Sequence, residues 1–507
     1  MNFAVIRNLI GKILALVGLL MFIPLITAIV YKESARNIVS YLIPMLSLII
    51  IGGLLGYIKP ATDKKIGARE GFVIVSLSWL LMSLFGSLPF LISGYVTDFF
   101  TAFFEIVSGF TTTGASALTS AELNNMLVNG GHSLLMWRSF SHWIGGMGIL
   151  VFILAIIMES KDGSALYILK AESPGPQVGK IVSKMKLSSR ILYLIYIILT
   201  FLEIISLLIC HIFDKEMTLF DAIIISFGTA GTGGFATTAA SCSLYAPCSQ
   251  YVIATFMLLF GVNFSIYYWL LVRNFKDIVH NEELRWYFMV VILAITIITL
   301  QIFRLYSSFE EGFRHAYFQV ASIISTTGYT TTDYWSGAQG RWPALSLGIL
   351  LVLMLCGACA GSTAGGVKQS RILILGKYSR LKIRSMIAPR KVEVVRLDGK
   401  PISNNVMTST VAFFLLYIVV LVMCALLISI WNPAMNAIDG DPFTMLTASL
   451  SCISNIGPGL GSVGPAGGFS NFSWFSKLVL SFEMMAGRLE LFPLLILFSR
   501  TTWKKSV

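Results

Sequence analysis

The chain has 507 residues, of which 56% are hydrophobic and only 12% are charged. Its mean hydropathy is +0.79. Soluble domains carry about 25% charged residues, so this composition excludes an ordinary soluble protein and indicates a polytopic helical membrane protein. The net charge of +12 does not indicate a nucleic-acid partner, because in so apolar a chain basic residues first report membrane topology.

Long and short apolar segments alternate along the chain. The long segments predict membrane-spanning helices near 8–30, 39–58, 71–94, 132–158, 187–212, 251–272, 286–303, 343–366, 406–431 and 472–498. The short segments lie near 97–110, 217–230, 312–325 and 441–454. A helix of about 13 residues is roughly 20 Å long and cannot cross the roughly 30 Å hydrocarbon core. We therefore expect four half-length helices that enter the membrane and turn back. The first long segment follows Met1 without a small-residue cleavage site, which predicts a retained helix.

Basic residues are concentrated in three connections, 59–69, 161–190 and 368–400. The loops on the opposite side of the predicted bundle contain a single basic residue, Arg341. These loops are 115–131, 236–250, 329–342 and 458–471. By the positive-inside rule the three basic connections are cytoplasmic. The sequence thus predicts a multi-pass protein of the cell (inner) membrane with cytoplasmic N- and C-termini.

A unit of long helix, half-helix, turn and long helix occurs four times. We expect an N-terminal transmembrane hairpin at 1–60, followed by repeats at 69–160, 186–276, 283–400 and 402–507. All four repeats have the same predicted orientation, whereas inverted-repeat transporters have halves of opposite topology. Same-sense repetition favours four pseudo-symmetric units around a central pore, in an all-α membrane protein.

A glycine-containing turn follows each half-helix. Backbone carbonyls that replace water around a cation need chain geometries that glycine adopts cheaply. The half-helices also end at the turns, and their partially negative C-termini favour a cation. The turns contain no carboxylate, which argues against a divalent-selective ring. The candidate ion-binding residues are the turn glycines Gly114, Gly234, Gly328 and Gly457 and the threonines Thr112, Thr113, Thr232, Thr326 and Thr327. The threonine hydroxyls are either additional ligands or braces of the turn. The fourth turn is the least regular, since it lacks threonine and precedes Pro458.

Ten consecutive small residues, 357–366, occupy the inner part of the eighth long segment. Each glycine in a helix interior costs about 1 kcal/mol relative to alanine, so a rigid helix is not expected there. Two interpretations are open, a mobile loop that gates the pore and close helix packing through small residues. The candidate gate residues are Gly357, Gly361, Ser362, Thr363, Ala364, Gly365, Gly366, Lys368 and, from the last segment, Arg488.

Ionisable residues within apolar segments are costly and therefore informative. Arg488 either pairs with Glu483 or Glu490 or forms a positive barrier below the turns. Arg138 lies near a segment end, where its side chain is expected to snorkel to the interface. For Glu105, Glu203 and Asp221 we expect buried structural pairing.

Cysteine and histidine usage gives little support for an enzyme. Cys356 and Cys359 form a C-x-x-C in an apolar segment, which favours helix packing over a metal site. Cys242 and Cys248 share an outward loop, so a disulfide between them is an open alternative. Five scattered histidines lack metal-ligand spacing, and no G-x-x-x-x-G-K-[ST] motif occurs, so we expect neither catalysis nor a nucleotide bound by this chain.

Together these motifs resemble the Trk/Ktr/HKT superfamily of potassium transporters over nearly the whole chain. The resemblance depends on the four turns, Trp143-Ile144-Gly145-Gly146-Met147-Gly148, the segment 361–368 and Gly487-Arg488-Leu489-Glu490. The N-terminal hairpin is similar to that of the TrkH branch. The resemblance implies that the two residues before each turn glycine coordinate potassium, which adds Gly233, Asn455 and Ile456 to the candidate ion-binding residues. It implies further that 357–367 is an intramembrane gating loop and that Arg488 lies beneath the filter. It also implies a homodimer in membrane lipid and a cytosolic ring of TrkA-type nucleotide-binding regulatory subunits docked on 161–190 and 368–400.

The sequence thus predicts channel-like potassium uptake driven by the membrane potential. A proton- or sodium-coupled potassium symporter is the alternative, and it should show carboxylates near the membrane midplane.

Overall fold

The computed structural model describes residues 1–57, 67–148, 185–337, 340–388, 394–430 and 441–503. These residues are mainly helical, and the one sheet found among them is a two-stranded antiparallel hairpin of β1 (Arg396–Leu397) and β2 (Lys400–Pro401). The predicted all-α class is confirmed. Most of the basic connections 59–69 and 161–190 lies outside the described residues.

Among the described residues, six helical spans are long and apolar enough to cross a membrane. They are α1 (Phe3–Leu20) with α2 (Phe22–Val30), α3 (Ala35–Tyr57), α4 (Ala68–Gly86) with α5 (Leu88–Ser93), α11 (Met185–Cys210), α16 (Glu282–Ile302) and α20 (Asn404–Ile430). The N-terminal hairpin pairs α1 closely with α3, because Gly11 and Gly52 let the two backbones meet: an added Cβ on either would lie 2.5 Å from a backbone nitrogen of the other helix.

The four predicted half-helices are present at the expected places. They are α6 (Phe99–Phe110), α12 (Leu219–Gly231), α17 (Phe309–Ile324) and α21 (Pro442–Ser454). Each begins at a residue whose side chain accepts a hydrogen bond from a backbone N–H of the first turn. These N-caps are Asp98, Thr218, Ser308 and Asp441. Side-chain capping of otherwise unpaired N–H groups explains where the half-helices start.

The helices that follow the turns are shorter than the sequence predicts. They are α8 (His132–Gly146), α13 (Pro247–Phe260), α18 (Ala344–Cys356) and α22 (Trp474–Arg488). The expectation of continuous spans at 251–272 and 472–498 is therefore wrong, whereas α18 ends at Cys356, directly before the small residues 357–366 where a rigid helix was not expected. After α13 the chain bends by 91° into α14 (Phe264–Leu271), and Asn263 caps the new helix by accepting a hydrogen bond from Ser265 N at 2.9 Å. After α22 it passes through Leu489, Glu490 and Leu491 into α23 (Phe492–Leu497). For 132–158, only the part up to residue 148 is described, and its helix has already ended.

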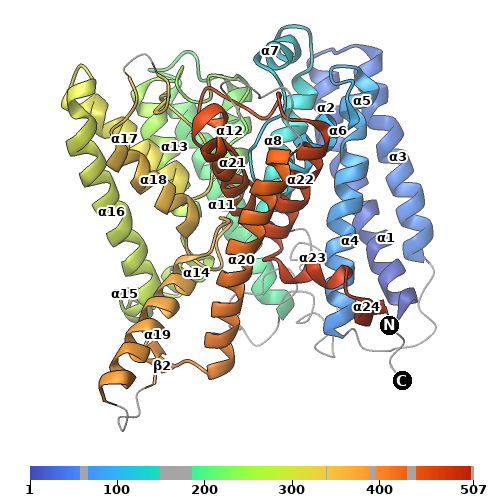
Figure 1. The fold of residues 1–507 in the computed structure, drawn as a ribbon. Helices are drawn as coiled ribbons and strands as arrows, with labels where there is room; N and C mark the ends of the chain where they lie inside the picture. The colour runs from blue at the N-terminus through green and yellow to red at the C-terminus, as the bar shows by residue number, and fades with distance from the viewer. Residues whose placement is uncertain (58–66, 149–184, 338–339, 389–393, 431–440, 504–507) are drawn as a thin grey trace.

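The remaining described elements lie at the two ends of the bundle (Figure 1). At the upper end in this view is α7 (Ser120–Val128), and at the lower end are α15 (Phe275–His280), α24 (Arg500–Trp503) and residue 1. The basic helix α19 (Gln369–Ile387) and the β hairpin project from the lower end. The N-terminus and α19 thus lie at the same end, as the predicted topology requires. Two short 3-10 turns, Phe303–Leu305 and Gly461–Val463, complete the described elements.

Candidate functional site: a ring of turns and the adjoining helix breaks

The four turns after the half-helices share one backbone conformation. Two residues before each turn glycine the chain enters the left-handed region, with φ between 56° and 57°, at Thr112, Thr232, Thr326 and Asn455. The next residue then donates its N–H to the carbonyl five residues earlier, in the pairs Thr113–Ser108 (2.9 Å), Gly233–Gly228 (2.8 Å), Thr327–Ser322 (2.9 Å) and Ile456–Ser451 (3.0 Å). This is the Schellman type of helix end. The irregular fourth turn therefore has the same backbone geometry as the other three.

The four turn glycines close a ring. Each has positive φ, from 75° at Gly234 to 101° at Gly457. A Cβ on Gly114 would lie 1.8 Å from Gly233 O, one on Gly234 2.0 Å from Thr327 O, and one on Gly328 2.0 Å from Ile456 O. The last contact returns to the first turn, since a Cβ on Gly457 would lie 2.8 Å from Thr113 O. Each turn therefore packs its glycine against a carbonyl of the next turn, in the cyclic order one to four.

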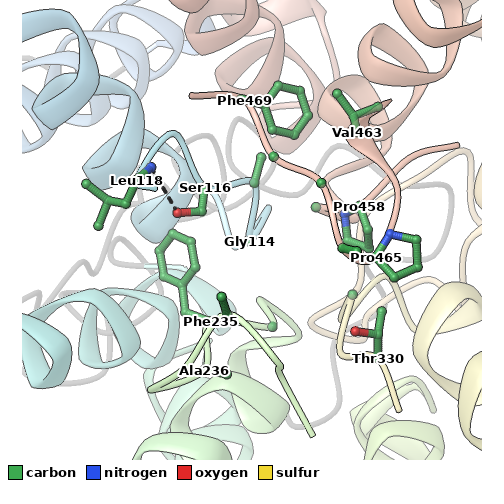
Figure 2. Close-up of a pocket in the computed structure, with 18 of the residues that line it drawn as sticks. Gly114, Ser116, Leu118, Phe235, Ala236, Thr330, Pro458, Val463, Pro465 and Phe469 are labelled. Atoms are coloured by element: carbon green, nitrogen blue, oxygen red, sulfur yellow. Dashed lines mark hydrogen bonds between the residues drawn. The ribbon is translucent and has the colours of Figure 1, made fainter. Parts of the chain in front are cut away.

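A cavity of about 120 Å³ lies on one side of this ring. All four turn glycines line it, together with the segments that follow them, and its lining includes no carboxylate. Figure 2 shows these segments surrounding the opening: Gly114 and Ser116 from the first repeat, Phe235 and Ala236 from the second, Thr330 from the third, and Pro458 and Pro465 from the fourth. The cavity thus leads to the ring.

Several threonine hydroxyls of the turns make bonds within the protein. The Oγ1 atoms of Thr113 and Thr327 bond to the hydroxyls of Thr111 (2.8 Å) and Ser325 (2.7 Å). Asn455 Nδ2 donates to Thr113 Oγ1 at 2.9 Å and so links the fourth turn to the first. Of the two interpretations of these hydroxyls, bracing of the turn is therefore the one observed at Thr113 and Thr327.

The helix breaks of different repeats also contact one another. The loop 357–368, which we call the small-residue loop, bonds to the break after α13, since Cys359 N donates to Gly261 O (3.1 Å) and Phe264 N to Gly361 O (3.1 Å). The same loop contacts the turns: Gly365 N donates to Thr326 Oγ1 at 2.7 Å, and a Cβ on Gly365 would lie 2.2 Å from Ser454 O. The small-residue loop therefore lies against the third and fourth turns.

Arg488 connects this loop to the first repeat. Its guanidinium donates to Thr363 O at 2.7 Å, to Gly146 O at 2.5 Å and to Gly145 O. These carbonyls lie at the end of α8 and in the small-residue loop, so one side chain joins three of the four helix breaks. The side chain of Glu490 pairs instead with Arg371, which also lies over the Phe413 ring at 4.0 Å from its centroid.

Glu283 holds both ends of the small-residue loop. Its Oε1 accepts hydrogen bonds from Ala360 N at 2.7 Å and from Ser370 N at 2.9 Å. Gln369 adds a bond from Nε2 to Gly357 O at 2.7 Å. The carboxylate is buried, and charged hydrogen bonds to backbone N–H groups are among the stronger ones in proteins. The loop is therefore irregular in backbone but tied at defined points.

The comparisons with known proteins agree with this architecture. The family model TrkH, described as a cation transport protein, matches residues 38–505. The chain belongs to the TrkH family of cation transport proteins.

Similar proteins extend over the full length of this TrkH-family chain. The Trk system potassium uptake protein TrkH of Escherichia coli (strain K12) is 32% identical and covers 100% of both chains. The Trk system potassium uptake protein TrkG of the same strain is 30% identical, with 99% of this chain and 98% of that protein covered. The crystal structure of the potassium transporter TrkH from Vibrio parahaemolyticus matches with a TM-score of 0.84 and 30% identity, covering 99% of this chain and 100% of that one.

The family fold brings the predicted site residues together, but it corrects two expectations about side chains. Arg138 does not snorkel: its guanidinium is buried and pairs with Glu105 at 2.5 Å. Glu203 is buried, but neither of its oxygens has a hydrogen-bond partner within the described part of the chain, so the expected structural pairing is not found there. The Cys242–Cys248 disulfide, which the sequence left open, is not formed; both thiols are free, and Cys248 Sγ lies 4.0 Å from Cys210 O.

Two features of the site were missed in the sequence. The first feature is that the other repeats also have helix breaks, as the third repeat does at 357–366. In the second repeat, the sequence signal for this break is Asn263, a polar residue within an apolar segment. Glu283, at the start of a span, is the second feature, and its partners Ala360 N and Ser370 N lie 77 and 87 residues away along the chain. Asn263 has a local partner, Ser265 N, but this bond does not indicate that the break contacts the small-residue loop.

The Glu105–Arg138 pair offers a test of what stabilises the first ring. Glu105 also accepts from Ala117 N (3.0 Å) and Ser116 Oγ (3.0 Å), and Arg138 reaches Phe235 of the second repeat, 4.1 Å from the ring centroid. We expect Glu105→Gln to destabilise the protein by about 3–5 kcal/mol, because it leaves a buried guanidinium without its counter-ion. Thermal unfolding in detergent, followed by size-exclusion chromatography, measures this.

Glu310→Gln is the matched control, because the Glu310 carboxylate is 56% exposed in its pair with Arg314. It should cost no more than about 0.5 kcal/mol. Equal thermal shifts for the two variants would contradict a special role of the buried pair.

Proposed function

We propose that this chain takes up potassium across the inner membrane through a channel-like pore with the four turns as its selectivity filter. The observation that carries the proposal is the closed ring of turns, in which glycines and carbonyls of four repeats meet in cyclic order. Rings of backbone carbonyls that replace a hydration shell are how potassium-selective filters are built. The names of the relatives, which describe potassium uptake proteins, support the choice of ion.

The filter residues in this proposal are those predicted from the sequence, with the residue before each glycine supplying a carbonyl. An inside-negative potential supplies about 2.3 kcal/mol per charge per 100 mV, so a selective pore can accumulate potassium without a co-ion. The small-residue loop and Arg488 act in this proposal as the gate, because the loop contacts the third and fourth turns through Gly365, Arg488 bonds to the loop at Thr363 O, and neither of them lines the cavity. We further propose a homodimer and control by a cytosolic nucleotide-binding ring that docks on the basic end of the bundle around α19.

Potassium and sodium flux into proteoliposomes under an imposed potential tests the proposal. We expect potential-driven potassium uptake that exceeds sodium uptake and does not need a proton gradient. Uptake that occurs only with a proton or sodium gradient would instead support the second candidate, a coupled symporter. Specific observations favour considering that candidate: Glu203 and Glu483 are carboxylates buried within membrane helices, and each has at least one oxygen without a hydrogen-bond partner among the described residues.

The role of Glu283 can be tested separately from the filter. Glu283→Ala removes the acceptor for Ala360 N and Ser370 N and so frees both ends of the small-residue loop. We expect a several-fold rise in potassium flux at unchanged potassium/sodium ratio, because the gate loosens while the turns keep their contacts. Glu283→Gln retains a carbonyl oxygen as acceptor and should lie closer to the unmodified protein. A flux that falls in both variants, with intact protein in chromatography, would contradict the proposed tether.

A further inference from the structure

The second turn lacks a side chain that its counterparts possess. The residue before the turn glycine is Thr113, Thr327 or Ile456 in the other repeats, but Gly233 in the second. The backbone does not require glycine there, because Gly233 is not among the residues with positive φ, unlike Gly234 that follows it. Something other than chain conformation therefore excludes a side chain at this place.

The imidazole of His142 occupies that space. A Cβ on Gly233 would lie 2.2 Å from both Cγ and Nδ1 of His142, and 2.5 Å from Cε1. Contacts this close do not occur between real atoms, so a side chain at 233 and the imidazole cannot coexist in this arrangement. His142 comes from α8 of the first repeat, so the first repeat fills the volume that the second repeat leaves empty.

The ring of His142 is fixed from three sides. Its Nδ1 lies 2.8 Å from Gly109 O, and because a carbonyl only accepts, Nδ1 carries the proton. The imidazole also lies against Phe235, with 4.3 Å between ring centroids. The side chain is completely buried, and its Nε2 has no hydrogen-bond partner in the described part of the chain. The imidazole thus joins the end of the first half-helix to the backbone of the second turn.

We propose that His142 is a positioning residue that sets the place of the Gly233 carbonyl and thereby determines ion selectivity. Gly233 O is the atom against which Gly114 packs, so the contact between the first two turns depends on where the imidazole holds Gly233. The proposal rests on the proposed function, because it assigns a role within the same filter. It differs from a simple packing role, since a packing residue can be replaced without changing which ion passes.

Paired substitutions test this idea. His142→Ala should lower the potassium/sodium flux ratio about tenfold, because the second turn loses its lateral support and the first half-helix loses the hydrogen bond to Gly109 O that fixes the imidazole. His142→Gln should retain most of the ratio, since the Gln amide can donate to Gly109 O from a similar volume.

Gly233→Thr alone should abolish potassium flux, because the new side chain overlaps the imidazole. The double variant His142→Ala with Gly233→Thr should regain selectivity, because the second turn then carries its own side chain.

The measurement is potassium, rubidium and sodium flux in proteoliposomes, with monodispersity in chromatography as the test of folding. His315→Ala is the matched control. His315 is also a buried histidine whose Nδ1 makes a hydrogen bond, here to Thr331 Oγ1 at 2.9 Å, and the substitution should not change the potassium/sodium flux ratio.

An unchanged ratio in folded His142→Ala, or normal flux in Gly233→Thr, would overturn the proposal. If His142→Ala does not fold, failure of the double variant to recover would overturn it as well. If the unmodified protein does not discriminate between potassium and sodium, the proposed function itself fails.

Discussion

Gly328→Ala is expected to reduce the potassium/sodium flux ratio by at least about tenfold, equivalent to about 1.4 kcal/mol of discrimination. Two costs combine at this residue. Its φ of +87° is unfavourable for any residue with a Cβ, by roughly 1–2 kcal/mol. The added methyl would also lie 2.0 Å from Ile456 O, so the carbonyl of the fourth turn must move. Because that carbonyl is a proposed ion ligand, the displacement acts directly on selectivity. Flux of both ions into proteoliposomes measures it.

The other turn glycines and a distant one provide the controls. Gly114→Ala and Gly234→Ala meet carbonyls at 1.8 and 2.0 Å and should behave similarly, whereas Gly457→Ala meets Thr113 O at 2.8 Å and should be milder. Gly348 in α18 has open space around it, so Gly348→Ala should leave the ratio unchanged. Full discrimination in Gly328→Ala would show that the ring is not the filter.

Arg488→Gln is expected to raise potassium flux about tenfold without loss of selectivity. The guanidinium stays charged at any accessible pH and bonds to carbonyls of two other helix breaks, so in the proposed pathway it would repel a cation that leaves the ring. It also ties Thr363 of the small-residue loop to Gly145 and Gly146, and the substitution weakens this connection. Removal of the charge and loosening of the loop both favour an open path. Rubidium tracer uptake under an imposed potential gives the rate.

Arg488→Lys separates the two contributions. Lysine keeps the positive charge but lacks the planar fork that reaches carbonyls of two different segments. If the charge is the main barrier, Arg488→Lys should conduct like the unmodified protein; if the tether dominates, it should conduct like Arg488→Gln. A folded Arg488→Gln protein with unchanged or lower flux would contradict a gating role.

Local signals explain why the half-helices and turns could be predicted. Capping residues such as Asp98 and Asp441 lie directly before short apolar segments, and glycines follow them at similar offsets. These are interactions within a few residues, and they recur in all four repeats. Even the fourth turn adopts the common geometry, because Asn455 tolerates the left-handed region that threonine adopts in the others.

The helix breaks and buried pairs could not be predicted in the same way. Leu259 and Phe260 continue an apolar pattern up to Gly261, and hydropathy alone does not distinguish a continuous helix from one bent by 91°. The bend is stable because the small-residue loop of another repeat supplies hydrogen-bond partners to the freed backbone groups, as membrane-buried irregular backbone requires. Arg138 was misjudged for a similar reason, since Glu105 lies on a different helix.

By itself the sequence determined the membrane class, the four half-helices and the residues of the four turns, because apolar length, caps and glycines act over short distances along the chain. Only the tertiary structure decided that the turns close in cyclic order, that Arg488 and Glu283 hold the small-residue loop, and that His142 takes the place of a side chain at Gly233. The ring, the bonds of Arg488 and the place of His142 depend on contacts between different repeats, and the bonds of Glu283 join residues 77 and 87 positions apart within the third repeat. Such contacts are fixed by the packing of backbone against backbone, which no single segment encodes.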